Sequence, residues 1–140
     1  MRGDVYLDTE ATASEVLDHL VRLGAEDASV IATQIWERML RFNNNALSVT
    51  KTIKDVVVFA YVSLGGRRII GSTSNPTQNA LKDFTRRLID SCKMLEPSPH
   101  HTHLPKGPFS YPTHRNYDPK IESCEERLLE DYAKQIIDQA

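Results

Sequence analysis

Residues 67–95 constrain the fold of this chain more than any other stretch, because they hold a strand, a turn and a long amphipathic helix in succession. An apolar strand at 68–72 leads into a polar turn. The helix is expected to begin at Pro76, with Asn75 as N-cap and Gln78 reaching back as in a capping box. Its apolar positions recur at spacings of three and four: Leu81, Phe84, Leu88, Cys92 and Leu95. This pattern predicts a strand-to-helix crossing against which the other elements pack.

Residues 28–42 are rich in β-branched and aromatic side chains, which favours a long strand, bulged or bent near residues 36–39. A helix across 33–40 is the competing interpretation, because short apolar runs are ambiguous. On the N-terminal side of this segment, apolar side chains recur at helical spacing over residues 13–23, after a capping-box pattern that starts at Thr12. They predict the first helix.

Two shorter segments also have the character of strands. Residues 47–53 alternate between polar and apolar, which is typical of a half-exposed strand. Residues 56–62, VVVFAYV, are continuously apolar and predict a central strand buried on more than one side. The polar pair 54–55 is expected to separate these two strands, and Gly65–Gly66 supplies a hairpin turn into the next.

Four consecutive strands joined by short turns predict a mainly antiparallel meander. With helices packed on one face, the expected fold class is α+β, a two-layer sandwich. The 140 residues are expected to form a single domain, 1–140, with a flexible N-terminus at 1–12. Residues 96–122 hold six of the seven prolines and predict an irregular connector. A C-terminal helix is expected at 123–140, starting near Ser123.

Composition narrows the functional classes. The net charge of −2 gives no overall attraction to nucleic acid or to an anionic membrane. No apolar run has the length of a membrane span, and the N-terminus has no secretory pattern, so a cytoplasmic protein is expected. Cys92 and Cys124 are expected to be free thiols in a reducing compartment, with a disulfide between them as the alternative.

A histidine-rich tract is the most conspicuous chemical feature. His100, His101 and His103 lie close together, and His114 follows. Short His-rich tracts can bind metals, so the first three are weak candidate ligands. Prolines flank the tract, no cysteine lies nearby, and no HExxH motif occurs in the chain. The expectation is therefore no metal site, no cofactor and no catalytic residue.

A basic face offers an alternative function, a small stand-alone module that binds protein or nucleic acid. The face comprises Arg67, Arg68, Arg86 and Arg87. Asp83 and Asp90 interrupt it on the predicted helix, so a solvated charged surface is favoured and nucleic-acid binding is not expected.

Five landmarks in order carry a resemblance to a known family. They are LGAEDA at 23–28, RFNNN at 41–45, LGGRRIIGSTSN at 64–75, LPKGP at 104–108 and YDP at 117–119. Over about residues 13–140, the chain resembles the N-terminal domain of the TldD/PmbA family. These metalloprotease-related proteins are also called modulators of DNA gyrase.

The resemblance implies a non-catalytic function for this chain. Family members that are proteases carry a zinc-binding HExxxH-type helix beyond this region, and the motif does not occur here. Zinc is therefore expected only in a downstream region. The family's proteins look like dimers or heterodimers around a cavity, which implies a homo- or hetero-oligomer or a C-terminal domain as partner. The expected role is in assembly and in access for peptide substrates during proteolysis.

Overall fold

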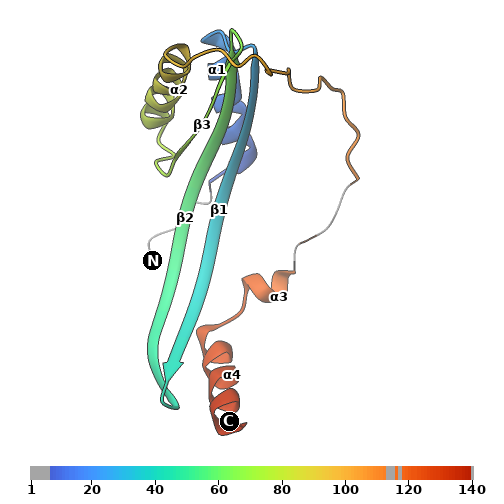
Figure 1. Ribbon diagram of the computed structural model, residues 1–140. Coiled ribbons are helices and arrows are strands. Elements are labelled where there is room, and N and C mark those ends of the chain that lie inside the picture. Colours follow the sequence, from blue (N-terminus) through green and yellow to red (C-terminus); the bar gives the residue numbers. More distant parts are fainter. Residues whose placement is uncertain (1–6, 113–115, 117, 140) are drawn as a thin grey trace. The chain divides into compact units, whose positions relative to one another are not determined.

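The computed structural model describes residues 7–112, 116 and 118–139. The elements run in the order α1 (Thr9–Arg22), β1 (Asp27–Asn43), β2 (Ala46–Leu64), β3 (Arg67–Thr73), α2 (Gln78–Lys93), α3 (Pro119–Glu122) and α4 (Glu126–Gln139), as labelled in Figure 1. Among the described residues, no helix is both long and apolar enough to cross a membrane.

The contacts divide the predicted single domain into two compact units. The first comprises residues 1–35 and 55–106, and the second comprises residues 36–54 and 107–140. The first unit therefore contains α1, β3 and α2 with the adjoining parts of β1 and β2. The second contains the hairpin end of β1 and β2, together with α3 and α4.

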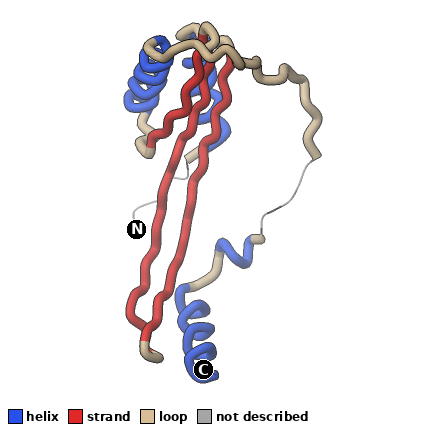
Figure 2. Tube along the Cα trace, in the orientation of Figure 1, coloured by secondary structure: helices blue, strands red, loops and turns tan. Residues whose placement is uncertain are grey.

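The described strands form one sheet in the order β1-β2-β3 (Figure 2). β2 and β3 pair antiparallel, from Val58 opposite Thr73 to Leu64 opposite Arg67. The predicted α+β class with an antiparallel sheet is confirmed, but the predicted count of four strands is wrong. The two segments separated at 54–55 are one continuous strand, because both residues are exposed and a strand accepts exposed polar side chains without a turn.

The hairpin turns lie where the chain adopts left-handed backbone conformations. Asn44 and Asn45 have φ angles of 51° and 56°, and Gly65 and Gly66 have φ angles of 58° and 72°. Asparagine and glycine are the residues that tolerate this conformation, so both turns follow directly from the sequence. β1 is a strand throughout, so the competing helix across 33–40 is wrong.

The core of the first unit lies between α1, α2 and one face of the sheet. β2 contributes alternate residues, Val58, Ala60 and Val62, all of them buried. The helices contribute Val16, Leu20, Leu81, Phe84, Leu88, Ile89 and Cys92. Gly71 of β3 lies so close to α2 that an added Cβ would be 2.7 Å from Leu88 Cδ1. The predicted packing of helices on one face of the sheet is thus observed in this unit.

Both long helices of the first unit begin at residues other than those predicted. α1 begins at Thr9, within the segment predicted to be flexible, because Asp8 is its N-cap and accepts a hydrogen bond from Ala11 N at 2.9 Å. α2 begins at Gln78 after the N-cap Thr77. The predicted cap, Asn75, instead accepts hydrogen bonds from Thr77 N at 3.1 Å and Thr77 Oγ1 at 2.8 Å.

The predicted apolar face of α2 is confirmed from Leu81 to Cys92, which are buried. Leu95 lies beyond the helix end and is 42% exposed. At the other end of the chain, two helices replace the one predicted from Ser123. α3 begins with Pro119 after its N-cap Asp118, inside the predicted connector, and Ser123 ends it.

The face of the sheet opposite the helices carries exposed apolar side chains in the first unit. Ile31 of β1 is 61% exposed, Phe59 of β2 is 45% exposed and Ile70 of β3 is 71% exposed. We call these three residues the open sheet face. The prediction that residues 56–62 are buried on more than one side is therefore wrong for Phe59 within this chain.

Candidate functional site

A buried carboxylate lies at the start of β1. Asp27 is the first residue of the strand, and its side chain is 5% exposed. Its neighbour Glu26 donates a backbone hydrogen bond to Ser63 O at 2.9 Å, which places the start of β1 beside the end of β2. The Ser63 hydroxyl, also buried, donates to Asp27 Oδ2 at 2.8 Å. The two residues alternate with core positions and so belong to the side of the sheet away from the helices.

The histidine tract reaches this carboxylate from 76 positions away in sequence. His103 Nδ1 lies 2.8 Å from Asp27 Oδ2, within hydrogen-bonding distance. His101 Nε2 lies 3.9 Å from the same oxygen, and the two imidazole rings meet edge to face with centroids 5.1 Å apart. Two of the three candidate histidines are thus brought to one point.

The loop that carries these histidines is held to the first unit by backbone contacts. Ser98 N donates to Gly66 O at 2.9 Å, and His101 N donates to Ser98 O at 3.2 Å. Arg67 supports the approach of the chain, because its Nε donates to Leu95 O at 2.7 Å. Part of the predicted connector is therefore an ordered covering over the ends of β1 and β2.

The polar surroundings of Asp27 lower the pKa of its carboxyl group. The Ser63 hydrogen bond contributes most, followed by the hydrogen bond with His103, and the backbone of Leu104 adds a further one. Burial acts in the opposite direction but does not outweigh them. The pKa lies below its usual value of 3.8, so the group is an anion at neutral pH.

His101 is the least satisfied member of the cluster. Its side chain is 11% exposed, and neither ring nitrogen has a hydrogen-bond partner in the structure. Buried polar atoms usually have partners, because leaving one unpaired costs about 1–3 kcal/mol. The unpaired imidazole beside a buried carboxylate makes this cluster a candidate site for binding an additional ligand.

The three residues have the proximity that a cation site requires. Asp27, His101 and His103 each offer one ligand atom, and these atoms lie within 4.8 Å of one another. His100 is not part of the group, and His114 lies outside the described residues. Sequence reasoning missed Asp27 and Ser63, because only the pairing of β1 with β2 brings them under the loop. A polar residue at the head of an apolar strand was the available signal.

Three of the four arginines of the predicted basic face, Arg67, Arg86 and Arg87, have local partners. Arg67 donates to Leu95 O and, through Nη1, to Gly65 O at 3.2 Å. Arg86 Nη1 lies 3.7 Å from Asp83 Oδ1, and Arg87 Nε donates to Asp83 O at 3.3 Å. These contacts give the predicted alternative, a small stand-alone module that binds protein or nucleic acid, no added support.

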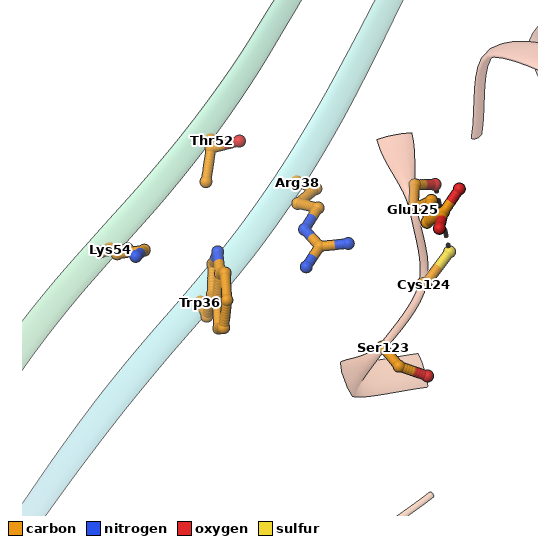
Figure 3. A pocket seen from close by; sticks show the side chains of 7 residues that line it. All are labelled: Trp36, Arg38, Thr52, Lys54, Ser123, Cys124 and Glu125. Atoms are coloured by element: carbon orange, nitrogen blue, oxygen red, sulfur yellow. Dashed lines mark hydrogen bonds between the residues drawn. The ribbon is translucent and has the colours of Figure 1, made fainter. Parts of the chain in front are cut away.

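A shallow pocket of about 510 Å³ lies in the second unit. Figure 3 shows the residues that line it: Trp36, Arg38, Thr52, Lys54, Ser123, Cys124 and Glu125. Arg38 Cζ lies 5.0 Å and Lys54 Nζ lies 4.5 Å from the centre of the Trp36 ring, which are cation–π distances.

Cys124 is a free thiol, as is the buried Cys92, so the predicted alternative disulfide is absent between them.

Solved structures share this fold, including the following two. A proposed modulator of DNA gyrase from Bacteroides thetaiotaomicron matches with a TM-score of 0.75 and 17% identity, covering 98% of this chain and 32% of its own. TldE from Thermococcus kodakarensis matches with a TM-score of 0.75 and 12% identity, covering 86% of this chain and 28% of its own. No protein-family model matches the sequence, and no curated protein matches it.

These matches define the class of the domain. The chain is an α+β domain with the fold found in gyrase-modulator and TldE structures, and it spans about a third of their length. The resemblance to the TldD/PmbA family, inferred from the five landmarks, is thus confirmed at the level of the fold.

Proposed function

We propose that this chain is a non-catalytic domain of a TldD/PmbA-like protein that acts in assembly and in access for peptide substrates. The observation that carries the proposal is the open sheet face, found on a fold that the structural neighbours contain within chains about three times as long. A sheet that packs helices on one face and leaves Ile31, Phe59 and Ile70 exposed on the other needs a cover.

The partner we assign to the open sheet face is a second copy of this chain. Ile70 lies opposite Tyr61 in the β2–β3 register, and Phe59 lies opposite Ser72, so the apolar side chains lie on adjacent strands. Two such faces are self-complementary, as a two-fold dimer requires.

The non-catalytic assignment rests on the helices. A zinc site of the HExxxH type needs two histidines on one helix, and no described helix carries two. The residues present therefore do not fit the zinc centre that the family resemblance implies for proteases, and we derive no hydrolytic step for this chain.

Sedimentation of the 140-residue chain tests the assembly role. We expect a concentration-dependent dimer that Ile70→Lys weakens at least about tenfold, because a lysine in the interface must be desolvated. Val21→Lys is the matched control, because Val21 is 58% exposed on α1, away from the open sheet face. A monomer at all concentrations, or equal weakening by both variants, would contradict a dimer through this face.

The substrate role places a peptide on a sheet edge. β3 pairs with β2 on one side only among the described strands, so its other edge offers unpaired backbone groups. An extended peptide can add to such an edge through main-chain hydrogen bonds, without demanding a particular sequence.

Hydrogen exchange tests this edge pairing. We expect an unstructured peptide to slow exchange at β3, and an N-methylated version of the same peptide, which lacks donors, to have no effect. Equal protection by both peptides, or none by either, would contradict edge pairing.

A further inference from the structure

We propose that Asp27, His101 and His103 form a binding site for one divalent transition-metal ion of the zinc class. The site lies in the first unit, at the end of the sheet where the loop carrying the histidines covers β1 and β2. Neither the assembly role nor an HExxxH helix is needed to infer it.

The donor set selects the class of metal. Two imidazoles and one carboxylate suit zinc and its neighbours in the first transition row, whereas calcium and magnesium prefer oxygen ligands alone. The buried carboxylate supplies one negative charge that a cation neutralises. Because His103 is 63% exposed, the site is open to solvent on one side, which leaves room for water as a further ligand.

Of the two measured distances between candidate ligand atoms, one is shorter and one is longer than the separation expected in a zinc site. Zinc–nitrogen and zinc–oxygen bonds of about 2.0–2.2 Å in a tetrahedral site place ligand atoms about 3.4 Å apart. Asp27 Oδ2 lies 2.8 Å from His103 Nδ1 and 3.9 Å from His101 Nε2. All three ligand atoms lie within 4.8 Å of one another, so closing the site requires side-chain shifts of up to about 1.4 Å, with the His103 proton moved to Nε2.

His101 gives the strongest reason for a ligand. Its ring is nearly buried, yet neither nitrogen has a hydrogen-bond partner. A metal held by Nε2 would satisfy one of these atoms. If His101 only filled space, an apolar side chain could fill the same space without the free-energy cost of burying an unpaired polar ring.

The groups around Asp27 resemble those that orient metal ligands. Ser63 donates to the carboxylate at 2.8 Å. Such outer contacts fix the position of a ligand, and their removal typically weakens metal affinity about 10–100-fold. Ser63 is thus a positioning residue, whereas the proposed ligands are Asp27, His101 and His103.

Metal titration of the untagged 140-residue chain, first stripped with a chelator, tests the site. We expect one zinc ion per chain by calorimetry, and a cobalt complex whose visible absorption reports nitrogen and oxygen ligands. His101→Ala and His103→Ala should each weaken binding at least about tenfold, and Ser63→Ala about 10–100-fold. Zinc should also raise the thermal unfolding midpoint of the wild type by more than that of these two histidine variants.

His100→Ala is the matched control, because His100 lies in the same tract but outside the cluster. Unchanged affinity in this variant supports the site. Equal weakening by His100→Ala and His101→Ala would show adventitious binding by exposed histidines and overturn the proposal, as would the absence of a stoichiometric ion. Because Asp27→Asn can disturb folding, the decisive variant is His103→Ala, whose largely exposed side chain is not needed for the core.

Discussion

At the scale of single residues, Asp27 shows most clearly what a sequence conceals. Its side chain interacts with Ser63, 36 positions away, and with His103, 76 positions away. No local pattern links these three residues. His101 and His103 were visible as candidates because they lie two positions apart in sequence, whereas their carboxylate partner required the pairing of two strands and the return of a loop.

The lowered pKa of Asp27 predicts an acid-dependent loss of stability. Because the folded-state pKa lies below the usual 3.8, the charged form stabilises the fold fully above that value, and the contribution disappears as pH falls through the folded-state pKa. In metal-free buffer, Asp27→Asn should therefore be less stable than wild type at pH 7, and the difference should shrink below about pH 4. Urea unfolding at a series of pH values measures this, and a difference independent of pH would contradict it.

Gly71 gives a second prediction at this scale. An added Cβ would lie 2.7 Å from Leu88 Cδ1, so Gly71→Ala should destabilise the fold by about 1–3 kcal/mol through overpacking. Leu88→Ala opens the space, and the double variant should cost less than the sum of the two single variants. Chemical denaturation of all four proteins measures the coupling. Strict additivity would show that the contact is not the cause.

At the scale of elements, the helix faces follow from the sequence and the helix starts do not. The spacing from Leu81 to Cys92 predicts the buried face of α2 because a helix repeats every 3.6 residues. The starts depend on which of several capable side chains faces the free N–H groups. Asn75, Thr77, Asp8 and Thr12 all suit a cap, and only the path of the preceding chain chooses among them.

The cap of α1 can be tested directly. Asp8→Ala removes the acceptor for Ala11 N and should cost about 1 kcal/mol of stability. Asp8→Asn is the control, because its side-chain oxygen keeps the acceptor, and its loss should be smaller. Thermal unfolding of the two variants gives the comparison. An equal loss would assign the effect to charge rather than to the hydrogen bond.

At the scale of the whole molecule, the division into two units predicts how the chain tolerates truncation. Every residue of the buried core cluster belongs to the first unit. A chain ending at residue 106 should therefore keep a cooperative unfolding transition, because it retains that core and the covering loop. Calorimetry measures the transition, and its loss would show that the part of the second unit beyond residue 106 is required for folding of the first.

A shorter chain that ends at residue 95 provides the comparison with the chain ending at 106. It lacks the histidine loop, which leaves Asp27 and Ser63 without that cover. We expect its unfolding midpoint to lie below that of the chain ending at 106, by about 4–8 °C for each kcal/mol lost. Equal midpoints would show that the loop contributes nothing to stability.

The sequence by itself determined the elements whose patterns are local. The α+β class, the apolar face of α2 and both hairpin turns follow from periodicity and from residues that tolerate positive φ. The tertiary structure alone decided what depends on neighbours. It joined two predicted strands across 54–55, left the open sheet face without a cover, and brought Asp27 to the histidines. Local chemistry fixes the backbone of a segment, but burial and side-chain proximity arise only when distant segments meet.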